Sequence, residues 1–573
     1  MFAQILRTLL ILTLCCVCVS AQTSTANSAA TPANTSESTV GSITGSVVNE
    51  SGQPLAGAQV FVRRLNYAGG ARNATSDSEG TFRINGLTSG LYVVTASAPG
   101  YVQAAWDSDL SGTHYRVGDN VRLELIRGGV ITGSVTTAAG EPLIALTVQA
   151  WMVRDAKGRI TKFPFAFYMQ QATDDRGIYR LFGLMPGTYI VSAGGNGFAQ
   201  RYQVTPYSND MPTYSPSSTR DGAAEISVRA GEESTADIRY RGEQGHAVSG
   251  SVKLASGAGS SVTLTSATGA FMSFGGAYLQ AGNRTFEFTG LADGDYVLIA
   301  REIVPGSAPS PSEMMMSDPQ RVTVKGADVT GIELTTKPLA SLSGRIVLDA
   351  TKPLECEGKR SPTFSEMNVT VVGAQKDKDN DLMPSYPTTN SASPDEKGSF
   401  TIRGLVPGRY MPQPQFYGRY WYLNSMTNAV PPKMDAAANW STLKVGQRTE
   451  VTITLTEGAA SIRGKISTAN GVAIPPALGV YLVPAEREKS ADVLRYFITP
   501  IEADGTFSFN NLPPGRYVAF TQTIDADTNT LAKLRLPEAA DTRAKLRRTA
   551  EAQKTNLELK PCQNLTNYQL PLK

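Results

Sequence analysis

Histidine, cysteine and long apolar runs are all scarce in this 573-residue chain. The two histidines, His114 and His246, lie far apart in the sequence, and there are five cysteines. A catalytic zinc site needs several clustered His, Glu or Cys ligands, so these residues predict none. Beyond the first 21 residues no stretch is apolar enough for a transmembrane helix.

Charge of one sign is also lacking. Charged residues make up 18% of the chain, and 53 basic against 50 acidic side chains leave a formal net charge of +3. A nucleic-acid partner requires a concentrated basic surface, so we expect none. The sequence also contains no Gly-x-Ser-x-Gly elbow, no P-loop and no dinucleotide glycine motif. We therefore expect neither an enzyme nor a cofactor.

The N-terminus has the pattern of a secretory signal peptide. Arg7 precedes an apolar run from Leu9 to Val19, and Ser20 and Ala21 complete a small-residue cleavage site. We predict a signal peptide over 1–21 and hence export to the periplasm, outer surface or extracellular space. A retained anchor is the alternative, but the run is short for a membrane span.

Three of the five cysteines lie within that signal peptide. Cys356 and Cys562 remain, and two cysteines in an exported chain predict one disulfide. Two free buried thiols or an intermolecular bridge are the alternatives. A disulfide between Cys356 and Cys562 requires their Cα atoms to lie within about 7 Å. It would fasten together the last two of the domains that are predicted below.

Proline and glycine are abundant, with 33 and 53 residues. They interrupt helical periodicity almost everywhere, which predicts an all-β chain. The exception is residues 537–554, a polar stretch that fits a surface helix or a long loop. Residues 22–40 are rich in Ser, Thr and Ala and predict a disordered tail.

Two motifs recur five times in the same order. The first is an opening strand with apolar-x-Gly-x-apolar alternation, found at residues 43–47, 131–135, 248–252, 342–346 and 462–466. The second is a Leu-x-x-Gly-x-Tyr turn, found at residues 87–92, 184–189, 291–296, 405–410 and 512–517. A glycine on the inward face of a strand predicts close backbone approach or a bulge.

The two motifs divide the mature chain into repeats. A hairpin with Asp and Gly before an aromatic residue precedes most of the tyrosine turns, as in DSEGTF at residues 77–82. We predict a tandem array of about five immunoglobulin/transthyretin-like seven-stranded β-sandwich domains. Their expected boundaries are 41–126, 127–242, 243–337, 338–456 and 457–573.

These motifs resemble the carboxypeptidase regulatory-like domain family of exported bacterial proteins. The first repeat fits best, with GQPLAGAQV at residues 52–60, and the second keeps GEPL at residues 140–143. The resemblance implies a transthyretin-like sandwich that is an accessory module in carboxypeptidases. The family is also structurally similar to starch-binding-like modules, which have a carbohydrate-binding-like fold. No zinc peptidase domain accompanies it in this chain.

The densest aromatic cluster lies in the fourth repeat. It contains Tyr417, Tyr420, Trp421 and Tyr422, and exposed aromatic faces of this kind stack on sugar rings. Alternation places Tyr420 and Tyr422 on one face of a strand and Trp421 on the other. The alternative is that these side chains pack a loop against the sandwich.

Two functions are compatible with these sequence features. The first is a non-catalytic binding or spacer protein whose partner is a polysaccharide or envelope glycan, or other envelope proteins. The second is a structural or protein-interaction array, or an accessory subunit of an envelope complex, with no glycan ligand.

Overall fold

The computed structural model describes residues 40–573 with several gaps. The gaps are residues 66–69, 104–113, 157, 159, 161–169, 196–205, 256–258, 268–272, 281, 304–313, 351–353, 374–390, 429–438, 469–473, 476–477, 503, 525–538, 554 and 573. The expected signal peptide and all but the last residue of the expected tail lie outside the described residues. No helix in the described part is long and apolar enough to cross a membrane.

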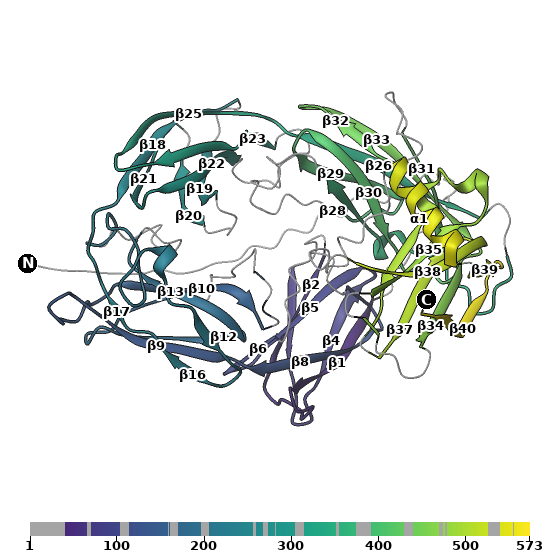
Figure 1. The fold of residues 1–573 in the computed structure, drawn as a ribbon, viewed down its shortest axis with the longest axis horizontal. Helices are drawn as coiled ribbons and strands as arrows, with labels where there is room; N and C mark the ends of the chain where they lie inside the picture. Colours follow the sequence, from purple (N-terminus) through teal and green to yellow (C-terminus); the bar gives the residue numbers. More distant parts are fainter. Residues whose placement is uncertain are drawn as a thin grey trace, which may run out of the picture. The chain divides into compact units, whose positions relative to one another are not determined.

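The chain is an all-β succession of sandwiches, as expected, and Figure 1 shows sheet pairs recurring along the sequence. The first sandwich contains β1 (Val40–Asn49), β2 (Gln59–Arg64), β3 (Ala71–Thr75), β4 (Thr81–Thr88), β5 (Leu91–Ser97), β6 (Tyr101–Gln103), β7 (Tyr115–Arg116) and β8 (Asn120–Arg127). The second contains β9 (Gly129–Thr136), β10 (Thr147–Asp155), β11 (Gln170–Ala172), β12 (Ile178–Leu184), β13 (Gly187–Ala193), β14 (Thr213–Tyr214), β15 (Ile226–Val228), β16 (Glu233–Thr235) and β17 (Ile238–Arg239).

The third sandwich joins its two layers into one continuous sheet, because β23 pairs with both β22 and β25. Its strands are β18 (His246–Lys253), β19 (Gly259–Ser266), β20 (Ser273–Leu279), β21 (Thr285–Leu291), β22 (Gly294–Ile303), β23 (Met315–Ser317), β24 (Gln320–Val324) and β25 (Val329–Pro338).

The last two sandwiches again consist of paired sheets. The fourth contains β26 (Ala340–Asp349), β27 (Asn368–Gly373), β28 (Ser391–Ala392), β29 (Ser399–Leu405), β30 (Gly408–Gln415), β31 (Trp421–Asn428), β32 (Ser441–Leu443) and β33 (Arg448–Glu457). The fifth contains β34 (Ala460–Ser467), β35 (Leu478–Pro484), β36 (Phe497–Pro500), β37 (Thr506–Leu512), β38 (Gly515–Thr523), β39 (Asn556–Leu559) and β40 (Asn564–Pro571).

The only α-helix in the described part, α1 (Ala540–Gln553), falls within the polar stretch identified from the sequence. It packs on β35 and β38, where Ala550 is fully buried in a cluster with Val518 and Phe520. A helix of this polarity does not have a strong apolar face of its own, so its contact with the sheet holds it in place.

Each opening strand has the same two neighbours. In the first sandwich β1 pairs antiparallel with β4 and parallel with the closing strand β8. The same arrangement recurs for β9, β18, β26 and β34. The first and last strands of each repeat therefore lie side by side, and the strand after the Asp-Gly hairpin forms the sheet edge.

The register explains why the two halves of the repeat motif occur together. The inward glycine of each opening strand lies directly opposite the hairpin aromatic: Gly45–Phe82, Gly133–Tyr179, Gly250–Phe286, Gly344–Phe400 and Gly464–Phe507. A Cβ at Gly45 would lie 2.0 Å from the Val121 carbonyl oxygen and 2.7 Å from the Phe82 ring. The expected close backbone approach is confirmed.

The tyrosine turns are tyrosine corners in all five sandwiches. Each tyrosine hydroxyl donates a hydrogen bond to the carbonyl oxygen four residues earlier, at 2.7–2.9 Å: Tyr92, Tyr189, Tyr296, Tyr410 and Tyr517. The residue before the leucine has a positive φ, which favours glycine. It is glycine in the first four sandwiches and Asn511, at φ 56°, in the fifth.

Candidate functional site

The aromatic cluster of the fourth sandwich lies at the start of β31. Tyr420 has a positive φ of 68°, and the next two residues begin the strand. Exposed fractions are 8% for Tyr420, 2% for Trp421 and 8% for Tyr422, so all three side chains are buried. Tyr417 is half-buried, and its hydroxyl donates to the His114 carbonyl oxygen at 3.2 Å.

Two asparagines of the fifth sandwich bind this segment. Asn511 Nδ2 donates to the Trp421 carbonyl oxygen at 2.7 Å, and Asn564 Nδ2 donates to the Tyr420 hydroxyl at 2.8 Å. The Tyr420 carbonyl oxygen accepts from the backbone N–H groups of Gly458 and Ala459, at 2.8 and 3.1 Å. Residues of the fifth sandwich and of the link between the two sandwiches therefore bind the Tyr420 hydroxyl and the carbonyl oxygens of Tyr420 and Trp421.

A disulfide crosses the same region. Cys356 follows β26 and Cys562 lies in the turn between β39 and β40, and the two are bonded with their Cα atoms 5.7 Å apart. The Cys562 N–H also donates to the Gly458 carbonyl oxygen at 3.2 Å. We call this region the 4–5 joint: it comprises residues 420–422, Gly458, Ala459, Asn511, Asn564 and the disulfide.

Burial limits what the aromatic cluster can do chemically. A sugar-stacking platform needs an open ring face, and the structure places Tyr420, Trp421 and Tyr422 in the interior. Trp421 belongs to the core of the fourth sandwich together with Val493 and Leu494 of the fifth. These three side chains are in packing contacts, which is the alternative to sugar binding given above. Of the four aromatic residues only Tyr417 is partly exposed.

The two histidines occupy different environments. His114 is only 7% exposed, and burial lowers the pKa of its imidazole because the charged form loses hydration. His246 Nε2 lies 3.5 Å from Asp293 Oδ1. Among the described residues no three His, Cys, Asp or Glu side chains are grouped to hold a metal ion.

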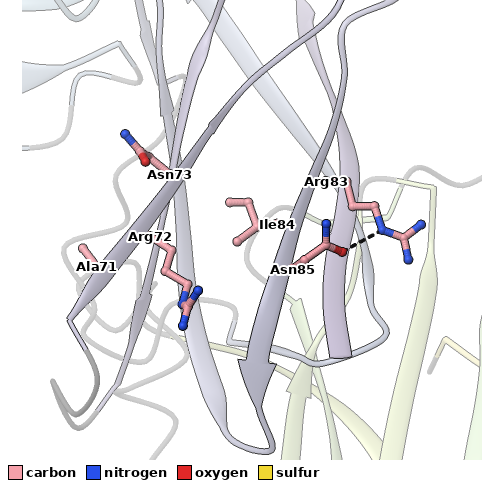
Figure 2. Close-up of a pocket in the computed structure, with 6 residues that line it drawn as sticks. All are labelled: Ala71, Arg72, Asn73, Arg83, Ile84 and Asn85. Carbon is pink, nitrogen blue, oxygen red and sulfur yellow. Dashed lines mark hydrogen bonds between the residues drawn. The ribbon is translucent and has the colours of Figure 1, made fainter. Parts of the chain in front are cut away.

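A hollow of about 300 Å³ lies on the first sandwich between β3 and β4. Figure 2 shows Arg72 on one strand and Arg83 with Asn85 on the other. Arg83 Nε donates to Asn85 Oδ1 at 2.9 Å, so its guanidinium is turned towards its own strand. The two arginines do not converge, and the hollow does not form an anion site.

Strand β12 of the second sandwich carries an apolar surface that sequence reasoning missed. Its outward residues Ile178 and Phe182 are 39% and 56% exposed. Arg180 lies between them and pairs with Glu233, with Nη2 3.1 Å from Oε2. Comparing the repeats for their differences, position by position, would have shown it.

The repeated corner, the shared register and the parallel first and last strands define a class: tandem β-sandwich repeat proteins. Within it, residues 42–123, which make up most of the first sandwich, match the carboxypeptidase regulatory-like domain. The match falls inside the expected first domain. No curated protein matches the chain.

Several solved structures of bacterial proteins resemble parts of this chain. The Bacillus anthracis TIE protein is 17% identical over 52% of this chain and 51% of its own, with a TM-score of 0.13. The shaft pilin SpaA of Lactobacillus rhamnosus GG is 12% identical over 35% and 98%, with a TM-score of 0.17. The minor pilin GBS52 of Streptococcus agalactiae is 13% identical over 35% and 94%, with a TM-score of 0.19. This chain thus spans about half of the TIE structure, and TM-scores this low say nothing of function.

Proposed function

We propose that the chain is an exported, non-catalytic spacer and binding protein of the cell envelope or extracellular space. The 4–5 joint carries this proposal. Its aromatic side chains are buried, and hydrogen bonds and a disulfide link the fourth sandwich to the fifth, so the joint fastens two domains. A disulfide between domains also suits an oxidising compartment outside the cytoplasm.

Two kinds of partner remain within this proposal. A polysaccharide or envelope glycan is supported by the likeness of the fold to carbohydrate-binding-like modules, which is an argument from analogy. A structural or protein-interaction role without a glycan is supported by the burial of Tyr420, Trp421 and Tyr422. That burial removes three of the four proposed stacking residues, so it favours the structural role.

Cell fractionation tests export. The protein should be found outside the cytoplasm with Gln22 as its first residue, as cleavage after Ala21 requires. A full-length chain that stays in the cytoplasm would contradict the proposal.

Retention on insoluble polysaccharides separates the two kinds of partner. Tyr417→Ala is the informative variant because Tyr417 alone is partly accessible, and Tyr101→Ala, at a half-buried tyrosine of the first sandwich, is its control. If a glycan binds at Tyr417, the wild type and the control are retained and Tyr417→Ala is not. If no polysaccharide retains the wild type, the glycan partner is abandoned and the structural role stands.

A further inference from the structure

The outer face of β12 differs from the same face in every other repeat. The shared register defines the two equivalent positions, which are the residue before the hairpin aromatic and the residue three after it. In the second sandwich they are Ile178 and Phe182. In the other four they are polar: Thr81 and Asn85, Thr285 and Thr289, Ser399 and Arg403, and Thr506 and Asn510. The fold therefore does not require apolar side chains there.

This face lies on a sheet edge. In the described part of the chain β12 pairs only with β9, and β4, β21, β29 and β37 are likewise end strands of their sheets. Proteins commonly place polar or charged side chains on such edges, because apolar edge strands associate with other chains. Four repeats follow that practice and the second does not.

The second sandwich also concentrates the exposed apolar surface. Eight large apolar side chains are exposed in the described residues, and four of them belong to this sandwich: Ile144, Ile160, Ile178 and Phe182. Exposing large apolar side chains in a group has a cost in water that a partner would remove. Ile178 and Phe182 share the outer face of β12, and an apolar pair found there in this repeat alone indicates an interface.

We propose that the outer face of β12 binds the same face of a second copy of this chain in a two-fold contact. Ile178, Arg180 and Phe182 lie at two-residue intervals on one face. A two-fold axis through Arg180 places Ile178 of each copy against Phe182 of the other. The surface is thus complementary to itself, as a two-fold interface requires.

The charges on the outer face of β12 are compatible with binding a second copy of this chain. The Arg180 guanidinium is paired with Glu233 of its own sheet, so two copies can approach without opposing unpaired charges. The same pairing leaves the surface without a free charge to select an acidic or basic partner. A sugar site needs several polar groups beside its aromatic ring, whereas on this face of β12 the residue next to Phe182 is the paired Arg180, followed by Ile178.

Sedimentation velocity of the chain over a range of concentrations tests the proposal. The informative variant is Ile178→Thr with Phe182→Asn, which places the residues of the first sandwich at these positions. Because both side chains are exposed, this variant should fold and melt as the wild type does. The matched control is Val445→Thr, at an apolar residue of the fourth sandwich that is 49% exposed.

We expect the wild type and Val445→Thr to dimerise and the double variant to associate at least about tenfold more weakly. Arg180→Cys tests the symmetry, because a residue on the axis meets its own copy. It should form a disulfide-linked dimer on oxidation, whereas Arg448→Cys, at an exposed arginine elsewhere, should not. A monomeric wild type, or a double variant that dimerises equally well, overturns the proposal. A monomeric wild type that binds a polysaccharide through Phe182 would assign the surface to a glycan.

Discussion

At the residue scale, the tyrosine corner is the feature that the sequence specifies most completely. A buried phenol is stable only if its hydroxyl finds a partner, and the carbonyl four residues earlier supplies one in every repeat. The positive φ of Asn511 shows the same requirement met without glycine, since asparagine tolerates the left-handed region best after glycine.

Burial of these tyrosines predicts alkaline instability. Desolvation raises the pKa of Tyr296 and of Tyr517 to about 12 in the folded chain, against about 10 in an unfolded one. The unfolded state therefore releases these protons first as the pH rises. The stabilisation is fully present below pH 10 and is lost progressively between pH 10 and pH 12.

Urea unfolding at pH 8, 10 and 11 measures this effect. The comparison is Tyr517→Phe, which removes both the hydrogen bond to the Pro513 carbonyl and the titrating group. The variant should be about 1 kcal/mol less stable at pH 8, because one buried hydrogen bond is lost. Its stability should then fall less steeply than that of the wild type above pH 10. Parallel pH dependences would contradict the assignment.

At the element scale, the pairing of glycine with an aromatic residue fixes the register of the opening strand. In the fourth sandwich an added Cβ at Gly344 would lie 2.5 Å from the Val451 carbonyl oxygen and 2.6 Å from the Phe400 ring. Gly344→Ala should therefore destabilise this sandwich by about 1–3 kcal/mol through overpacking. Gly373→Ala is the control, because its Cβ would meet only the Tyr410 ring at 3.6 Å.

Tryptophan fluorescence during urea unfolding reports on this change, because Trp421 and Trp440 are both buried in the fourth sandwich. The Gly344→Ala transition should shift to lower urea and the Gly373→Ala transition should shift little. Equal shifts for the two variants would contradict the explanation that Gly344 is required because the neighbouring strand leaves no room for a Cβ.

The same elements show how far sequence reasoning reached. Repeats, corners and inward glycines were predictable because each depends on contacts within one sandwich. The burial of Tyr420, Trp421 and Tyr422 was not, because alternation along β31 identifies only the face turned to its own core. Trp421 packs with Val493 and Leu494 of the next sandwich, and the Tyr420 hydroxyl accepts a hydrogen bond from Asn564 of that sandwich. No local pattern in the sequence records these contacts.

At the scale of the whole molecule, the 4–5 joint makes the fourth and fifth sandwiches one unit, and Val493 and Leu494 of the fifth pack in the core of the fourth. The disulfide links residues 206 positions apart, so it restricts the unfolded chain strongly. The hydrogen bonds of Tyr420 and Trp421 to the fifth sandwich hold the same joint in the folded chain. Removing the disulfide should therefore loosen the joint before either core unfolds.

The variant Cys356→Ser with Cys562→Ser tests this. We expect the last two sandwiches to lose about 2–5 kcal/mol of stability. Hydrogen exchange should also become faster at Gly458 and Ala459, whose N–H groups bond to the Tyr420 carbonyl oxygen. Exchange within β1, in the first sandwich, should stay unchanged and serves as the internal control. Reduction of the wild type should reproduce the variant, because both break the same bond. Unchanged exchange at Gly458 and Ala459 would mean that the asparagine and backbone hydrogen bonds hold the joint without the disulfide.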